Sequence, residues 1–153
     1  MLPDAVEPLA QALALAGMHI TIETAGTIFR TLPCDLMSIS PKLANSTPGE
    51  EHSAWRERHE RRRLQFDVLQ ELIDRYPVRQ FKFVITGAED WPEIDAILAK
   101  LHGWRDEEII LMPEGVTTPG PALRRTVLER CLSHNWRYGQ RLHIELFGNT
   151  RGT

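Results

Sequence analysis

Small, polar and ionisable residues follow four short apolar segments of this chain and are the best candidates for chemistry. They are Glu23-Thr24-Ala25-Gly26-Thr27, Ser40-Pro41-Lys42, Thr86-Gly87 and Met112-Pro113-Glu114-Gly115. Hydroxyls, backbone groups and a few charges in such positions suit the binding of a polar small molecule. Taken singly, each has an ordinary explanation, because Glu23 can cap a helix or pair with an arginine and Lys42 can be a solvated loop lysine. Their alignment at one edge of a sheet would make them a site.

Other kinds of chemistry have weaker support. The chain has two cysteines, Cys34 and Cys131, which are too few for a disulfide framework or a self-contained cysteine-ligated metal site. Cys131 shares an apolar stripe with Val127 and is expected to be a buried small hydrophobe. Cys34 has no neighbouring His or Lys to lower its pKa, which argues against a nucleophile. The six histidines are scattered, and no carboxylate completes a metal-ligand set at the right spacing.

The segment from Arg56 to Arg63 is dense in arginine. Glu57 and Glu60 interleave with the arginines, and Trp55 is the neighbouring aromatic residue. This pattern favours a solvated helix face with local ion pairs over a nucleic-acid patch. The whole chain has 18 Lys and Arg against 21 Asp and Glu, a net charge of −3, which argues against a general polyanion binder.

Helices and short apolar strands alternate along the chain and must position the four polar groups. A loop is expected over 42–52, and Ile94, Ile97, Leu98 and Leu101 form an amphipathic stripe behind an Asp90–Glu93 capping box. The alternation predicts βαβ units with a mostly parallel sheet, whose ligand site lies beyond the carboxyl ends of the strands. Helices are expected at 2–16 and 53–76, between Asp90 and Gly103, and from Pro121 to about His134, with strands at 19–23, 35–40, 80–85, 108–112 and 141–147.

Length and hydropathy indicate one domain over residues 1–153. Of the 153 residues, 42% are hydrophobic, which is enough for a substantial core. No apolar run approaches the roughly 20 residues needed to span a bilayer, and no signal peptide opens the chain. We therefore expect a cytoplasmic protein without a membrane partner. A helix before the first strand is an unusual start for a parallel α/β fold.

Six segments run in order over nearly the whole length of the chain: 19–27 (HITIETAGT), 35–42 (DLMSISPK), 81–84 (FKFV), 111–115 (LMPEG), 140–144 (QRLHI) and 148–153 (GNTRGT). The most specific piece is Ser40-Pro41-Lys42 at the end of a strand. Together these segments resemble the radical S-adenosylmethionine enzyme 7-carboxy-7-deazaguanine synthase.

This resemblance implies a fold and a reaction. The fold is α/β, a partial (β/α) barrel of the radical SAM type, here missing its first strands. A [4Fe-4S] cluster cleaves S-adenosylmethionine to a 5′-deoxyadenosyl radical, and Mg²⁺ orders the substrate. The radical rearranges 6-carboxy-5,6,7,8-tetrahydropterin to 7-carboxy-7-deazaguanine with loss of ammonia, on the route to queuosine. The family is commonly homodimeric.

The resemblance also implies site residues. Ser40, Pro41 and Lys42 would line the S-adenosylmethionine site, where serine and lysine engage the ribose and the carboxylate. The segment Met112, Pro113, Glu114 and Gly115 would close on the same cofactor, and Glu23 and Thr24 would face it. The family often has Asn at the position of Ala25. The terminal residue, Thr153, would lie at the pterin substrate.

The family's three cluster cysteines, its Gly-Gly-Glu-Pro loop and its magnesium ligand lie in an N-terminal part that has no counterpart here. Met1-Leu2-Pro3 resembles the residues that directly follow that loop. We therefore expect the C-terminal part of the enzyme, inactive by itself, with a complementing N-terminal segment as a partner. The alternative is a non-catalytic α/β module that binds S-adenosylmethionine or a related nucleoside. A third reading, an interaction protein that uses the arginine-rich helix, ranks below both.

Overall fold

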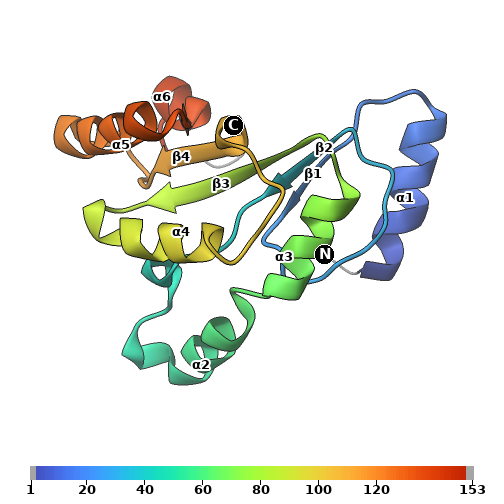
Figure 1. Ribbon diagram of the computed structural model, residues 1–153, viewed down its shortest axis with the longest axis horizontal. Helices are drawn as coiled ribbons and strands as arrows, with labels where there is room; N and C mark the ends of the chain where they lie inside the picture. The colour runs from blue at the N-terminus through green and yellow to red at the C-terminus, as the bar shows by residue number, and fades with distance from the viewer. Residues whose placement is uncertain (1–2, 151–153) are drawn as a thin grey trace.

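A five-stranded parallel sheet forms the centre of the molecule in the computed structural model, which describes residues 3–150 (Figure 1). The strand order is β1-β2-β3-β4-β5, so each strand lies beside the next one in the chain. This sequential order is that of a (β/α) barrel, whereas the order reverses at one point in a doubly wound sheet. The strands are β1 (Thr21–Thr24), β2 (Leu36–Ile39), β3 (Arg79–Ile85), β4 (Ile109–Pro113) and β5 (Arg137–Tyr138).

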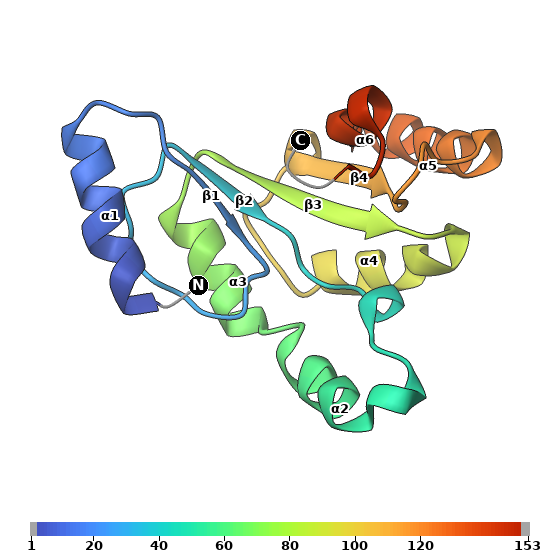
Figure 2. The same cartoon turned by 180° about the vertical axis from the view of Figure 1, so that it is seen from behind.

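Helices flank this sheet, and Figures 1 and 2 place α1 beyond β1 at one end and α5 with α6 at the other. In both views α2 protrudes below the level of α3 and α4. None of the helices described is both long enough and apolar enough to cross a membrane. The helices are α1 (Pro3–Leu15), α2 (Ser53–Arg62), α3 (Phe66–Arg75), α4 (Trp91–Leu98), α5 (Pro121–His134) and α6 (Leu142–Phe147), with short 3-10 turns η1 (Ala44–Ser46), η2 (Glu50–His52), η3 (Ala88–Asp90) and η4 (Asp106–Glu108).

The core lies between one face of the sheet and three of the helices. Phe81, Phe83 and Ile85 alternate along β3 and are fully buried, because successive side chains of a strand point to opposite faces. Helices α3, α4 and α5 contribute their buried apolar residues to the same cluster, including the predicted stripe on α4 and Cys131. The opposite face of the sheet is left for the polar residues described below.

The predicted helix over 53–76 is wrong in one respect, because it is two helices. Helix α2 ends at Arg62, and the backbone is not helical at Gln65 (φ −110°, ψ 88°), before α3 begins. Helix α2 has no buried residue, whereas Leu64 and the helix after it pack against the core. The chain therefore changes direction where its sequence acquires an apolar face.

The predicted strand over 141–147 is also wrong, since these residues form the short helix α6. Arg137 and Tyr138 occupy the edge of β4 instead, with Tyr138 opposite Leu111. The neighbouring Trp136 is buried, which draws this segment against the sheet before residue 141 is reached. Of the residues in α6, Ile144 alone is buried.

The predicted capping box of α4 is not formed. Asp90 has helical backbone angles (φ −78°, ψ −18°) at the end of the short turn η3, and its side chain makes no hydrogen bond to the first turn of α4. An N-cap residue normally has extended backbone angles, so its place in η3 removes Asp90 from that role. Helix α4 ends at Leu98, before the predicted stop at Gly103.

Candidate functional site

The uncovered face of the sheet carries polar side chains from three strands beside the apolar Val84 and Met112. Lys82 lies between Phe81 and Phe83 on β3 and points away from the core, and its Nζ is 2.9 Å from Oε1 of Glu23 on β1. Gln80, two residues earlier on the same face, donates a hydrogen bond of 3.0 Å to the Ser38 hydroxyl. This face leads to the carboxyl ends of the strands, where the ligand site of a (β/α) barrel lies.

A cavity of about 590 Å³ lies at those carboxyl ends. A second cavity of about 340 Å³ adjoins it and shares Ser40, Lys42, Val84 and Arg141. Both volumes suit a small organic ligand. The first cavity is lined by Glu23, Thr24, Ala25, Ser40, Lys42, Lys82, Val84, Met112, Gln140, Arg141, Leu142 and His143, and the second adds Pro41, Leu43, Asn45, Ser46, Thr86 and Glu114.

The hydroxyl of Ser40 is held in place by the sheet. The Ser40 amide donates to the Thr24 carbonyl (2.7 Å) as the strand pairing ends, and its Oγ donates to the Lys82 carbonyl (3.0 Å). Its hydroxyl proton is thus used, while the lone pairs of the same oxygen remain able to accept a hydrogen bond. Ser40 therefore presents a fixed acceptor to the cavity, suited to a ligand hydroxyl.

The cavity carries an excess of positive charge. Burial lowers the pKa of the Lys42 ammonium, and the positive charges of Lys82 and Arg141 lower it further, whereas the Glu23 carboxylate opposes the shift. Glu23 is paired with Lys82, so within this cavity Lys42 and Arg141 have no carboxylate of their own. A carboxylate on a ligand would relieve this repulsion and stabilise the charged lysine.

The loop that carries Lys42 is fastened from two sides. The Glu93 carboxylate accepts a hydrogen bond from the Ala44 amide (2.8 Å) and forms an ion pair with Arg63. Arg63 in turn donates to the Lys42 carbonyl (3.2 Å). Both side chains are largely buried, so water and salt screen this pair less than an exposed one. The loop is thus attached to both α4 and the end of α2.

Asp90 fastens the neighbouring loop at the end of β3. Its Oδ2 accepts hydrogen bonds from the amide of Thr86 (2.7 Å), the hydroxyl of Thr86 (3.0 Å) and the side-chain amide of Asn45 (3.0 Å). The amide of Gly87 lies 3.4 Å from the same oxygen. Because Thr86 and Asn45 both line the second cavity, Asp90 fixes two of its walls.

The segment that follows β4 closes the site from the other side. The Glu114 amide donates to the Ile85 carbonyl (2.7 Å), which continues the pairing of β4 with β3. Arg141 donates to the Gly115 carbonyl (3.3 Å), so the start of α6 is attached to this segment. Gly115 has φ +152°, in the region that favours glycine.

The structure brings together most of the residues that the sequence singled out. Glu23, Thr24, Ser40, Lys42 and Met112 line the first cavity, and Pro41 and Glu114 line the second.

Pro113 and Gly115 line neither cavity, and Thr153 is outside the described residues.

Lys82 and Arg141 are the main site residues that sequence reasoning missed. A lysine between two phenylalanines of a buried strand is the signal for Lys82, because strand alternation sends it to the uncovered face. Arg141 was missed because residues 141–147 were predicted to form a strand, whereas Arg141 precedes the helix α6. Within residues 3–150 no three His, Cys, Asp or Glu side chains are grouped so that they could hold a metal ion.

The fold and site together define the class of protein. A sequentially ordered parallel sheet, with its cavity at the carboxyl ends of the strands, is the predicted α/β fold of a partial (β/α) barrel. A crystal structure of QueE from Escherichia coli is similar with a TM-score of 0.59 over 89% of this chain and 50% of that one, at 22% identity. This likeness supports the fold.

Sequence comparisons then identify the particular relatives. The chain is 40% identical to a 7-carboxy-7-deazaguanine synthase of Halobacterium salinarum and 37% identical to one of Rhodopirellula baltica, over its full length in both cases. It is 29% identical to that of Pyrobaculum aerophilum over 96% of its length. These matches confirm the resemblance: the chain is homologous to the 7-carboxy-7-deazaguanine synthases. It spans 63%, 60% and 60% of the three relatives. No family model matches the chain.

Proposed function

We propose that this chain is the part of a 7-carboxy-7-deazaguanine synthase that binds S-adenosylmethionine and closes on the pterin substrate. The reaction of the whole enzyme is the rearrangement of 6-carboxy-5,6,7,8-tetrahydropterin to 7-carboxy-7-deazaguanine. The proposal rests on full-length similarity to synthases of that name and on the cavity at the carboxyl ends of β1 to β4.

The cavity supplies groups that match S-adenosylmethionine. The ammonium of Lys42 faces a carboxylate, and the Ser40 oxygen accepts a hydrogen bond from a ribose hydroxyl. Met112 provides an apolar contact, and Glu23 and Thr24 form the wall on β1. In this proposal Pro41, Pro113, Glu114 and Gly115 keep the two strand ends in place around the ligand.

Lys82 and Arg141 suit the second ligand. Both line the first cavity, and Arg141 also lines the second. The pterin carries a carboxylate, and a guanidinium fork binds a carboxylate through two parallel hydrogen bonds. We propose Arg141 and Lys82 as the positive charges that hold the substrate, and Thr153 as a further substrate contact.

The iron–sulfur cluster and Mg²⁺ of the family do not fit the residues described here. No set of three ligating side chains is grouped within residues 3–150, and of the two cysteines Cys131 is buried in the core. We therefore assign these ligands to a complementing segment outside this chain and derive no step through them. A homodimer, as in the family, is part of the same proposal.

Calorimetric titration of the chain with S-adenosylmethionine and S-adenosylhomocysteine tests the proposed site. A charge-assisted hydrogen bond contributes about 1.5–3 kcal/mol, so Lys42→Met should weaken binding about 10- to 100-fold. Ser40→Ala should weaken it by about fivefold to tenfold. Lys100→Met is the control, because Lys100 carries the same charge against the Phe66 ring and lines neither cavity.

Two results would contradict the proposal: full affinity in Lys42→Met, or an equal loss in the Lys100→Met control. Catalysis is tested separately by anaerobic reconstitution of the purified chain with iron and sulfide. We expect no stable four-iron absorption from this chain alone. A stable signal would contradict the assignment of the ligands to another segment.

A further inference from the structure

A third cavity, of about 230 Å³, lies against α2 and away from the substrate site. Trp55, Arg58, His59 and Arg62 line it from α2, and Pro48 and Thr27 face them from two loops. Lys42 also borders it, so the two sites share one wall. Helix α2 protrudes from the body of the molecule in Figures 1 and 2, which leaves this face open.

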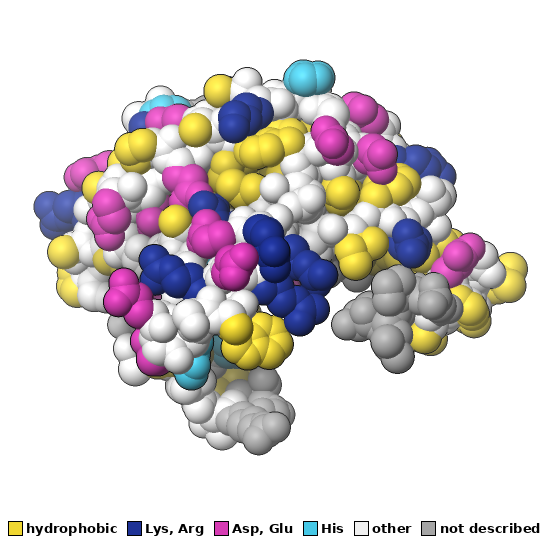
Figure 3. Space-filling view, turned by 90° about the horizontal axis from the view of Figure 1, so that it is seen from below, with side chains coloured by type: hydrophobic (Ala, Val, Ile, Leu, Met, Phe, Trp, Pro, Cys, Tyr) yellow, Lys and Arg dark blue, Asp and Glu magenta, His cyan; other side chains and the backbone are white. Residues whose placement is uncertain are grey.

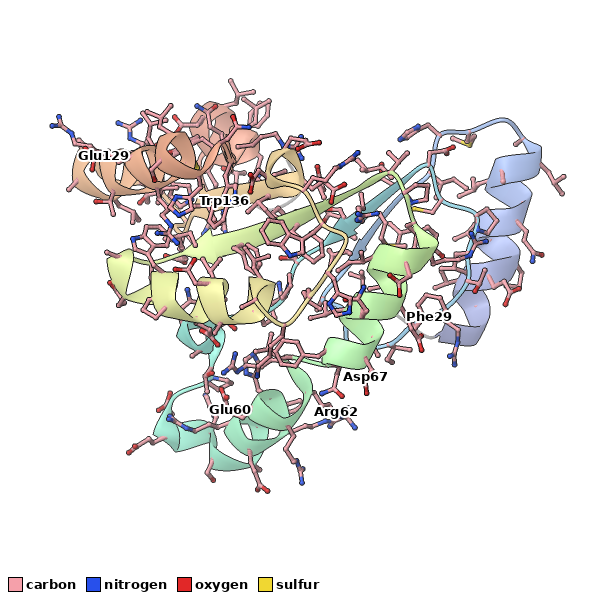
Figure 4. All side chains as sticks on the ribbon, in the orientation of Figure 1. Phe29, Glu60, Arg62, Asp67, Glu129 and Trp136 are labelled. Atoms are coloured by element: carbon pink, nitrogen blue, oxygen red, sulfur yellow. The ribbon has the colours of Figure 1, made fainter. Side chains whose placement is uncertain are left out.

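The arginines on this face lack the carboxylate partners that Arg61 and Arg63 have. Glu57 pairs with Arg61 (3.6 Å) and Glu60 pairs with Arg63 (2.8 Å). Figure 4 shows Glu60 and Arg62 leaving α2 on different sides.

Arg58 and Arg62, four residues apart and so on one face, form no ion pair within residues 3–150. Two like charges in this arrangement repel each other, and an anion between them would remove the repulsion.

Cationic residues border this cavity, whose inner surface is apolar. It is lined by Lys42, Arg58, Arg62 and Arg63 and by no acidic residue, and only Arg63 has carboxylate partners, Glu60 and Glu93. In Figure 3 Lys and Arg side chains gather near the middle of the face seen from below, next to hydrophobic atoms. Paired guanidinium groups match the geometry and the double charge of a phosphate monoester.

An aromatic surface accompanies this charge. The Trp55 side chain is 64% exposed, and the Arg58 guanidinium lies 5.6 Å from the centre of its ring. An indole this exposed contributes little to the core, and with Pro48 it supplies apolar lining to the cavity. The volume is below that of a typical drug-sized site, which limits the ligand to about one aromatic ring with its anionic group.

We propose that this cavity binds a small aromatic organic phosphate, with the ring against Trp55 and the phosphate between Arg58 and Arg62. The site is separate from the one assigned to S-adenosylmethionine and stands on different residues, apart from the shared border at Lys42. The ligand class follows from the combination of paired guanidinium groups, the absence of a lining carboxylate and an exposed ring.

Titration with phenyl phosphate, followed by the indole N–H resonances in two-dimensional NMR, tests this proposal. The Trp55 signal is assigned with Trp55→Phe. We expect a saturable shift of this signal, with at least tenfold weaker binding in Arg58→Gln/Arg62→Gln. The matched control, Arg56→Gln/Arg61→Gln, removes the same charge from other positions of the helix and should bind as the wild type does. Inorganic phosphate and phenol should each bind more weakly than phenyl phosphate.

Three outcomes would overturn the proposal. They are no saturable shift of Trp55, equal loss in the two double variants, and much tighter binding of a single-stranded oligonucleotide than of phenyl phosphate. S-adenosylmethionine affinity, measured on the same variants, keeps this proposal distinct from the function of the main site. It should be unchanged in Arg58→Gln/Arg62→Gln. Since α2 has no buried residue, the variants should fold, and their melting curves check this.

Discussion

Removing the Asp90 carboxylate should destabilise the protein and loosen the second cavity. Asp90 is 5% exposed, and one of its oxygens accepts hydrogen bonds from both Thr86 and Asn45, while the Asn45 amide also donates to the Val84 carbonyl (3.0 Å). In Asp90→Ala these donors lose a charged acceptor. In Asp90→Asn the amide oxygen can still accept these hydrogen bonds, but the negative charge of the carboxylate is lost.

The size of the effect follows from the three hydrogen bonds of 3.0 Å or less. A hydrogen bond to an ionised group contributes about 1.5–3 kcal/mol. Thr86 and Asn45 are exposed, so water replaces part of what they lose, and the contributions do not add fully. We expect Asp90→Ala to lower the free energy of unfolding by about 2–4 kcal/mol and Asp90→Asn by about 1 kcal/mol.

Urea unfolding followed by circular dichroism measures this loss. The midpoint should fall by about 1–2 M in Asp90→Ala with an unchanged slope. Glu89→Gln is the control, since Glu89 is the exposed carboxylate immediately before Asp90. Its free energy of unfolding should stay within about 0.5 kcal/mol of the wild type. A free energy of unfolding of Asp90→Ala within about 0.5 kcal/mol of the wild type, or an equal loss in Glu89→Gln, would refute the claim that Asp90 holds Thr86 and Asn45 in place.

Two further predictions concern the charge and the backbone of the site. Because burial and Lys82 lower the pKa of Lys42, its ammonium is lost at lower pH than in an ordinary lysine, so S-adenosylmethionine affinity should fall as the pH rises through that lowered pKa. Calorimetry over a pH series should show the fall moved to higher pH in Lys82→Met; an unmoved profile would contradict the assignment of the fall to Lys42. Gly26 has φ +70°, and a β-carbon there would overlap Leu69, so Gly26→Ala should cost about 2–4 kcal/mol in urea unfolding. Gly17→Ala, at φ +71° with no atom nearby, should cost only about 1–2 kcal/mol, and equal losses would rule out the overlap.

The periodic spacing of apolar residues predicted much of the fold, because it shows which side of each helix or strand is buried. The stripe Ile94, Ile97, Leu98 and Leu101 is buried as expected, and four of the five predicted strands are present. The failures occurred where local pattern and packing disagree. Residues 53–76 read as one helix, but only the second half has an apolar face, so the tertiary structure divides it.

Site residues that stand at the end of an apolar strand were predictable from the sequence. Ser40 and Met112 each follow or end an apolar run, and parallel pairing then brings them to one edge. Partners across the fold were not predictable in the same way. Glu93 carries a capping-box spacing, yet its carboxylate binds the amide of Ala44, 49 residues away. Such a contact depends on how the loop after β2 returns over α4. The residues near Glu93 in the sequence carry no information about that path.

A crystal structure of the chain with S-adenosylhomocysteine tests the central claim most directly. We expect electron density for the ligand between the carboxyl ends of β2 and β4. Its ribose should lie within hydrogen-bonding distance of Ser40 Oγ, and its carboxylate near Lys42 Nζ. Density at another place, such as the cavity beside Trp55, with the cavity at the strand ends empty, would contradict it.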